Sequence, residues 1–180
     1  MRLLLLLLTS FSLLAAACTK ADDDTPTTPL DELPPATQVG ANTFGCLING
    51  EPWYNRGGSF NRPDLSAGFY TSNSRNYLSV LGRAITPFLS TRNDRVEILF
   101  TDPAEGMTLT NTNWASPIRL TNEDYVFYRI DTSSYVKLSL TYLNLEMQVA
   151  SGTFEFTAIN NDIKDTLVVT DGRFDVEFVR

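Results

Sequence analysis

Carboxylates are the only abundant acid–base groups in this chain, which contains 21 aspartates and glutamates and no histidine. The absence of histidine excludes histidine-based catalytic triads and cysteine–histidine pairs. Two carboxylates on a β-scaffold could still hydrolyse a glycosidic bond. No spacing in the sequence selects such a pair, and outward-facing carboxylates are expected on half-exposed strands. The candidates are Glu51, Glu97, Asp131, Glu155 and Glu177.

The thiol of Cys46 is a second reactive group to consider. The chain has two cysteines, Cys18 and Cys46, which are too few for a disulfide scaffold or a cysteine-rich zinc site. Cys46 stands in the apolar run 44–48, and no basic residue is close to it in the sequence. A catalytic thiol needs a base or a positive environment to become a thiolate. We therefore predict that Cys46 is a buried structural cysteine.

Two loops are rich in side-chain oxygens, which are the ligands that calcium prefers. One spans residues 160–165 and contains Asn160, Asn161, Asp162 and Asp165, and the other is Thr121–Asp124. Neither loop follows the EF-hand spacing, and Asn and Asp also occur in turns for conformational reasons. We predict no metal site and no cofactor.

Aromatic residues near turns suggest a further kind of chemistry, the stacking of a sugar on an exposed ring. Trp53 and Tyr54 follow the turn at Asn49-Gly50 and a proline, and Trp114 ends the polar stretch 111–114. We predict Trp53, Tyr54 and Trp114 as ligand-binding residues, with asparagines supplying hydrogen bonds. The alternative is that the two tryptophans close the ends of the hydrophobic core, as large aromatic residues commonly do.

Composition limits the size and the partners of the protein. A chain of 180 residues has room for one ordinary domain and a tail. Its 43% apolar and 19% charged residues are typical of a globular protein. A net charge of −7 leaves no basic surface of the kind that binds nucleic acid. Nucleic acid is therefore excluded as a partner.

The first seventeen residues are typical of a secretory signal peptide. A positive start at Arg2 precedes an apolar run from Leu3 to Leu14 and the small residues Ala15–Ala17. This stretch is shorter than a membrane-spanning helix requires. Cys18, directly after the small residues, resembles the lipobox cysteine of bacterial lipoproteins, although the leucine lies one position further away than in the common pattern. The resemblance implies cleavage before Cys18 and a lipid anchor on it.

Residues 18–41 have the composition of a disordered tether. They include four prolines and few large apolar side chains, so the segment buries too little apolar surface to fold alone. Lys20 followed by Asp22–Asp24 resembles the surface-export signal of Bacteroidetes-type lipoproteins. This resemblance implies display on the outer face of the outer membrane, and a periplasm-facing position is the alternative. Apart from this resemblance, three adjacent carboxylates on a tail are expected to be solvated and to have no specific role.

Residues 42–180 alternate between apolar and polar with a period of two, which predicts half-buried β-strands. The alternation is clearest over 96–100, 136–140, 154–158 and 174–178, and looser over 78–82. Asn49-Gly50 and Asp171-Gly172 predict two-residue hairpin turns, the second joining a strand at 167–170 to one at 174–179. Residues 140–149 could form a helix, but the preceding alternation favours a strand. We predict one all-β domain, an antiparallel β-sandwich or barrel of roughly eight to ten strands.

Three segments together resemble a family of uncharacterised Bacteroidetes-type outer-membrane lipoproteins. These segments are Asn42–Trp53, Gly152–Ala158 and Thr170–Val176. The resemblance implies the compartment and an all-β architecture, but no catalytic residue.

We therefore expect a lipid-anchored cell-envelope protein whose domain binds a glycan or an envelope protein and is not an enzyme. One alternative is a structural or assembly subunit of an envelope complex. Another is a carboxylate-dependent glycoside hydrolase.

Overall fold

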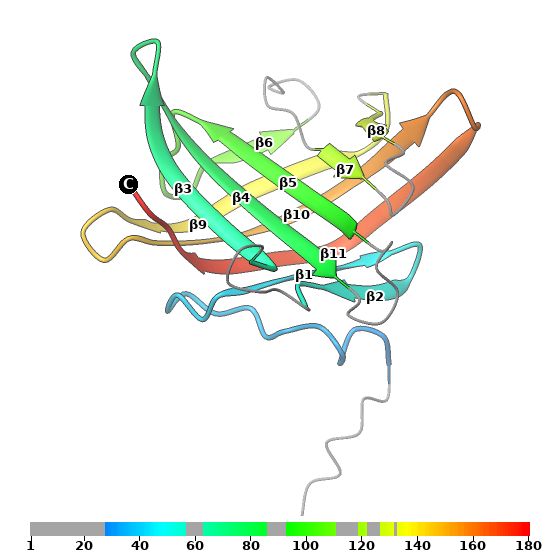
Figure 1. The fold of residues 1–180 in the computed structure, drawn as a ribbon, viewed down its shortest axis with the longest axis horizontal. Helices are drawn as coiled ribbons and strands as arrows, with labels where there is room; N and C mark the ends of the chain where they lie inside the picture. The colour runs from blue at the N-terminus through cyan, green and yellow to red at the C-terminus, as the bar shows by residue number, and fades with distance from the viewer. Residues whose placement is uncertain (1–27, 57–62, 86–92, 111–118, 122–126, 132) are drawn as a thin grey trace, which may run out of the picture.

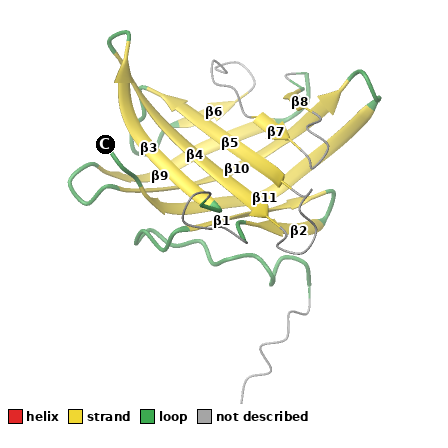
Figure 2. Cartoon of the chain, viewed as in Figure 1, coloured by secondary structure: helices red, strands yellow, loops and turns green. Residues whose placement is uncertain are grey.

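The structure is a computed structural model that describes residues 28–56, 63–85, 93–110, 119–121, 127–131 and 133–180. The described residues form eleven β-strands and no helix (Figure 2). The strands are β1 (Thr43–Ile48), β2 (Glu51–Tyr54), β3 (Leu65–Ser72), β4 (Arg75–Ile85), β5 (Asn93–Thr101), β6 (Thr108–Thr110), β7 (Arg119–Thr121), β8 (Phe127–Ile130), β9 (Val136–Asn144), β10 (Val149–Asn160) and β11 (Asp165–Glu177).

The strands form two antiparallel sheets that pack as an open sandwich and do not close into a barrel (Figure 1). Sheet A contains β2, β1, β11, β10, β9 and β6, and sheet B contains β3, β4, β5 and β7. Strand β8 pairs with β10 at one end and with β7 at the other, and so connects the two sheets. The sequence prediction of an all-β antiparallel domain is confirmed, and the sandwich is the correct alternative.

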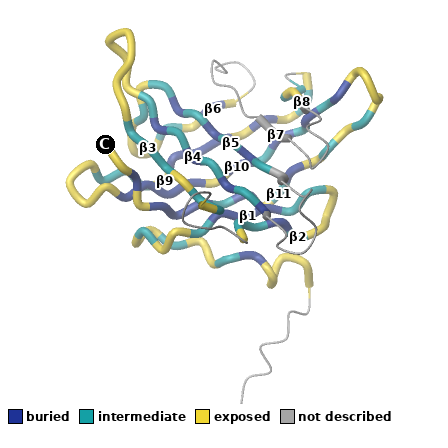
Figure 3. The backbone as a smooth tube through the Cα atoms, viewed as in Figure 1, coloured by how far each residue is buried: buried dark blue, intermediate teal, exposed yellow. Residues whose placement is uncertain are grey.

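The core lies between the sheets, and the residues that alternate in the sequence supply it (Figure 3). The apolar positions predicted in β4, β5, β9, β10 and β11 all face inward, as their burial shows. Rings from β1, β5, β10 and β11 meet in the centre, and Phe44 lies 5.1 Å from Phe154 and 6.4 Å from Phe174 between ring centroids. Each fully buried large side chain contributes about 1.5–3 kcal/mol, so these rings supply much of the stability of the fold.

Two-residue turns join several strands. Asn49 and Gly50, with φ of 53° and 85°, connect β1 to β2 as a hairpin, which confirms the prediction made from this pair. Asn73 and Ser74, with φ of 49° and 62°, make the same kind of turn between β3 and β4. The region 140–149 is not a helix, because β9 ends at Asn144, turns, and continues as β10 from Val149.

The predicted hairpin at Asp171-Gly172 is wrong. Both residues lie inside the single long strand β11, where the register with β1 and β10 shifts and forms a β-bulge. Asp171 takes a left-handed conformation with φ of 54°, which absorbs the extra residue without reversing the chain. Gly172 is required because a Cβ there would lie 2.4 Å from the ring of Phe154 on the paired strand. A bulge and a hairpin both use left-handed residues, so the local sequence does not distinguish them.

The described residues form eleven strands, slightly more than the roughly eight to ten predicted. The additional elements include β6 and β7, which have three residues each. Strands this short show no readable alternation, because they present only one or two residues to each face.

Residues 33–41, here called the N-terminal strap, lie against the outer face of sheet A although the sequence places them in the tether. Leu33 is buried, and Pro34 packs over Gly45, where a Cβ would lie 2.8 Å from the proline ring. Further along, Asp175 of β11 binds the backbone of the strap. The packed part of the chain therefore begins before Asn42. A proline-rich composition does not reveal this packing, because the hydrogen bonds that hold the strap come from Asp175, more than a hundred positions away.

Candidate functional site

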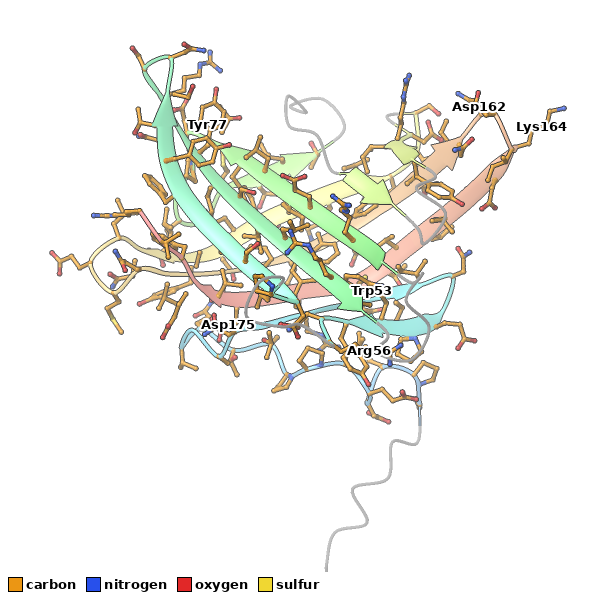
Figure 4. The ribbon with its side chains drawn as sticks, in the orientation of Figure 1. Trp53, Arg56, Tyr77, Asp162, Lys164 and Asp175 are labelled. Atoms are coloured by element: carbon orange, nitrogen blue, oxygen red, sulfur yellow. The ribbon has the colours of Figure 1, made fainter. Side chains whose placement is uncertain are left out.

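The outer face of sheet B presents a pair of tyrosines. Tyr70 of β3 and Tyr77 of β4 are directly opposed in the register, and their rings stack with centroids 5.4 Å apart and an interplanar angle of 18°. Both side chains point away from the core, because Phe69 and Leu78, their neighbours in the chain, face inward. Tyr70 is 47% exposed, and Tyr77 lies near the β3–β4 turn (Figure 4). The pair therefore offers flat aromatic surface to solvent.

The same face continues along β4 and β5 with half-buried side chains. Ser79 is opposite Leu99, and Leu81 is opposite Glu97, which gives the face both apolar and polar character. We call Tyr70, Tyr77, Ser79, Leu81 and Leu99 the tyrosine face. In Figure 1, β3, β4 and β5 run side by side as the near layer of the sandwich.

The outer face of sheet A is different, because the N-terminal strap covers it around Asp175. One oxygen of this carboxylate accepts hydrogen bonds from the amides of Val39 (3.0 Å) and Ala41 (3.1 Å). The other accepts from the Gly40 amide (2.9 Å) and from the hydroxyl of Ser151 (2.8 Å). The residue is 1% exposed, so this is a buried ionic clamp between the strap and β11 (Figure 4).

The clamp strongly favours the charged form of Asp175. Burial by itself raises the pKa of Asp175, but the hydroxyl of Thr37 and the three strap amides outweigh burial and lower the pKa to about 2. A carboxylate this stable as an anion is not a proton donor near neutral pH. Asp175 therefore has a structural role.

An open groove of about 390 Å³ borders the strap on sheet A. Three threonines, Gln38, Ala36, Gly152 and Phe174 line it. The side chain of Gln38 donates a hydrogen bond to the carbonyl of Thr141 at 3.5 Å. The described lining contains no acidic or basic residue. It holds no group suited to acid–base chemistry.

The structure separates the three aromatic residues predicted to bind a ligand. Trp53 is 8% exposed and packs edge-on against Phe44 in the core at 5.9 Å, so it closes the core and presents no ring face to solvent. Tyr54 is half-buried, with the guanidinium of Arg56 5.3 Å from its ring centre. Trp114 lies outside the described residues. The indole Nε1 of Trp53 is buried and has no hydrogen-bond partner in the part of the chain that the structure describes.

Cys46 is fully buried in β1, as predicted. Burial raises the pKa of its thiol, because the charged thiolate would lose its solvation. The thiol therefore stays protonated and unreactive at neutral pH. The lipidation candidate Cys18 lies outside the described residues.

The five candidate carboxylates are spread over the described fold. Glu97 is on the outer face of sheet B, whereas Glu155 is opposite Lys137 in sheet A. Glu51 follows the β1–β2 turn, and Glu177 is at the end of β11. Asp131 is occupied in a turn, where hydrogen bonds from Ser133 and Ser134 lower its pKa. The described residues thus show no paired acids in a cleft.

In the oxygen-rich loop at 160–165, side-chain oxygens accept hydrogen bonds from the chain itself. Asn160 accepts hydrogen bonds from the amides of Asp162 (2.8 Å) and Ile163 (3.1 Å), and so fixes the β10–β11 turn. Asp165 accepts from the hydroxyl of Tyr128 at 2.6 Å. Over the described ranges, no group of three or more acidic or cysteine residues gathers as metal ligands would. Most of the second loop, 122–126, lies outside them.

Comparison with known proteins identifies no relative. No protein-family model matches the chain, and no curated protein or solved structure matches it. Within the described residues, no helix has the length and apolar character needed to cross a bilayer.

Sequence reasoning missed the tyrosine face and the Asp175 clamp. A usable signal for the first was present, because Tyr70 and Tyr77 lie symmetrically about Asn73-Ser74, and a two-residue turn there pairs them across the hairpin. Asp175 gave no comparable signal, since its partners lie in a segment of tether-like composition.

Proposed function

We propose that this chain is a lipid-anchored cell-envelope protein whose domain is a non-catalytic binding module for a glycan. The observation that carries the proposal is the stacked pair Tyr70–Tyr77 on the outer face of sheet B, in which Tyr70 is exposed and Tyr77 is half-buried. Aromatic rings on a flat β-face bind sugars through the apolar C–H faces of the sugar ring. The binding residues proposed are Tyr70 and Tyr77, in place of the buried Trp53.

The anchor and the compartment rest on the N-terminal sequence. Cys18 would carry the lipid, and Lys20 with Asp22–Asp24 would direct the chain to the outer face of the outer membrane. Incorporation of labelled palmitate by the wild-type chain, and none by Cys18→Ala, tests the anchor. Digestion by protease added to intact cells tests surface display, and protection from the protease indicates the periplasm-facing alternative.

Ligand binding is tested by thermal unfolding of the full Cys18→Ala chain with a panel of neutral and acidic polysaccharides. A ligand at about 100 times its Kd stabilises the folded state by about 2.7 kcal/mol. For a domain of this size, that raises Tm by about 5 to 10 °C. We expect Tyr70→Ala to abolish the shift. Tyr135→Ala removes another exposed tyrosine, between β8 and β9, and should retain the shift.

Either of two results contradicts the proposal. A flat response to the whole panel removes the basis for a glycan-binding module. A shift that survives both Tyr70→Ala and Tyr77→Ala shows that any glycan binds elsewhere.

A second candidate, the structural or assembly subunit, is favoured by an exposed apolar end of the sandwich. Val39, Leu145, Met147 and Val179 are 71%, 40%, 64% and 73% exposed. The β9–β10 turn and the C-terminus lie at the same end (Figure 1), where the Phe178 amide donates to the carbonyl of Gln148 at 2.8 Å. Such an end can be buried in a complex. Loss of envelope cross-links in Met147→Glu, but not in Val168→Glu, would support this candidate.

A further inference from the structure

The stacked tyrosine pair leaves one ring face open, and that face points beyond the edge of sheet B. Tyr70 and Tyr77 form an offset stack, with centroids 5.4 Å apart and planes 18° apart, so one face of each ring lies against the other. Tyr77 is on the interior strand β4, where Thr101 of β5 is opposite it on the other side. Tyr70 is on the edge strand β3 and is 47% exposed. The free ring face of the pair is therefore the one that Tyr70 turns away from β4.

Backbone groups of β3 face the same open side. The amide of Phe69 donates to the carbonyl of Val179 at 2.8 Å, and the carbonyl of Ala67 accepts from the Val179 amide at 3.1 Å. Backbone groups that face one side of a strand recur at every second residue, so the amide and carbonyl of Thr71 also face away from β4. Among the described residues, Val179 is the only bridge partner of β3 on this side. The amide of Thr71 can therefore donate a hydrogen bond to a ligand that lies beyond β3.

An apolar side chain borders the same position. Val179 bridges Gly68, and bridge partners in a sheet point to the same face. Gly68 is two residues before Tyr70, so the side chain of Val179 lies on the outer face together with the Tyr70 ring. Val179 is 73% exposed, and a Cβ at Gly68 would meet only the Val179 carbonyl, at 4.0 Å. The space beside the ring is therefore open and partly apolar.

A single pyranose ring fits these features. A pyranose whose hydroxyls are equatorial has C–H groups on its faces and can stack on an aromatic ring. Its hydroxyls project from the ring edge, where one of them can accept a hydrogen bond from the Thr71 amide. A second sugar unit finds no equivalent surface, because Tyr77 is half-buried and Tyr70 covers one of its faces.

We propose that the tyrosine pair recognises one pyranose unit of a glycan at the β3 edge, where Tyr70 stacks on the sugar and the Thr71 amide donates to a hydroxyl. This inference rests on the proposed glycan-binding function and names the unit that the module binds. Tyr77 is then a positioning residue, because it holds the Tyr70 ring from behind without contacting the sugar. Further units of the glycan add little affinity.

NMR titration of the full Cys18→Ala chain, followed through backbone amide shifts, tests the size of the site. The probe pairs are methyl β-D-glucopyranoside with cellotetraose, and methyl β-D-galactopyranoside with galactotetraose. We expect at least one pair to bind and to shift the Thr71 amide. Its two members should have Kd values within about fivefold of each other, since four equivalent units raise the affinity only statistically. A larger advantage of the tetrasaccharide overturns the single-unit site and leaves the glycan-binding module intact.

Two substitutions at Thr71 separate its amide from its side chain. Thr71→Pro removes the N–H, which an edge strand tolerates where that group faces solvent. Thr71→Val keeps the N–H, and both variants lose the hydroxyl that donates to Oδ1 of Asn76 at 2.8 Å. We expect Thr71→Pro to bind about fivefold more weakly than Thr71→Val, as for the loss of one hydrogen bond. Equal binding by the two variants overturns the amide contact. If Thr71→Pro does not fold, the wild-type titration decides the question, because an unshifted Thr71 amide overturns the contact as well.

Variants of the other rings and of the sheet face complete the test. Tyr77→Phe keeps a ring behind Tyr70 and should preserve binding, whereas Tyr77→Ala should weaken it. Leu99→Gln changes the middle of the tyrosine face and should bind like the wild type. Loss of binding in Leu99→Gln places the sugar on the face instead of the edge, which overturns this inference but not the proposed function. Binding to none of the four probes also overturns it, and the polysaccharide panel then tests the glycan-binding module independently.

Discussion

Replacing Asp175 with asparagine should strongly destabilise the fold, because it removes the charge from a buried clamp. In the native state the pKa of Asp175 is about 2, against an ordinary value of 3.8. Since one pKa unit corresponds to about 1.36 kcal/mol, ionisation of this group contributes about 2.5 kcal/mol at pH 7. Asparagine also turns an NH₂ group towards donors, because each carboxylate oxygen accepts at least two hydrogen bonds. We expect a total loss of about 3 to 4 kcal/mol.

The pH dependence provides a sharper test than the size of the loss. The folded-state pKa of Asp175 is lowered, so its stabilisation is fully present above about pH 5 and is lost as the pH falls towards 2. Protonated Asp175 resembles asparagine. The difference between the wild type and Asp175→Asn should therefore shrink by about 2 kcal/mol between pH 5 and pH 2.

Urea unfolding at several pH values measures both quantities. Asp162→Asn is a matched control, because it neutralises an exposed carboxylate in the β10–β11 turn and should change stability by less than about 0.5 kcal/mol. Faster amide exchange at Gly40 in Asp175→Asn would locate the loss at the strap. A constant difference from pH 7 to pH 2 would refute the reasoning, since it would mean that the charge on Asp175 contributes nothing.

Three further predictions concern the core. A chain ending at Asp171 loses the inward-facing end of β11 and should show no cooperative melt by circular dichroism; a sharp transition would show that this end is dispensable. Gly172→Ala should cost about 1–3 kcal/mol in urea unfolding, because its Cβ meets the Phe154 ring, whereas Gly68→Ala should cost little; equal costs would contradict the packing argument. Cys46 should react with a thiol reagent only as fast as the protein unfolds, and rapid labelling of the native state would show that it is accessible.

The strand interiors could be predicted from the sequence, whereas contacts made across the fold could not. Phe154, Phe156 and Ala158 alternate with polar residues, and burial of one sheet face requires that pattern whatever the strand pairs with. At Gly172 the local sequence does not determine the backbone structure. The same Asp-Gly pair makes a hairpin or a bulge depending on whether a neighbouring strand supplies a ring to cover the glycine.

The residues of the proposed site differ from the aromatic residues that the sequence indicated. Trp53 belongs to the core, and the aromatic pair on the outer face of sheet B is Tyr70–Tyr77. A tryptophan in a short strand can face either way, and only the pairing of Cys46 with Trp53 in the β1–β2 hairpin turns it inward.

The N-terminal strap has a mechanical consequence for a protein held to a membrane through Cys18, as proposed. Any pull on the domain enters the fold from its N-terminal side, so the load reaches the strap before it reaches β1. Four hydrogen bonds to Asp175 resist that load. When these hydrogen bonds break, residues 33–41 can leave the sheet and lengthen the tether by up to about 30 Å, while every strand stays paired. We therefore expect the strap to detach from sheet A under load before any strands of the sandwich separate.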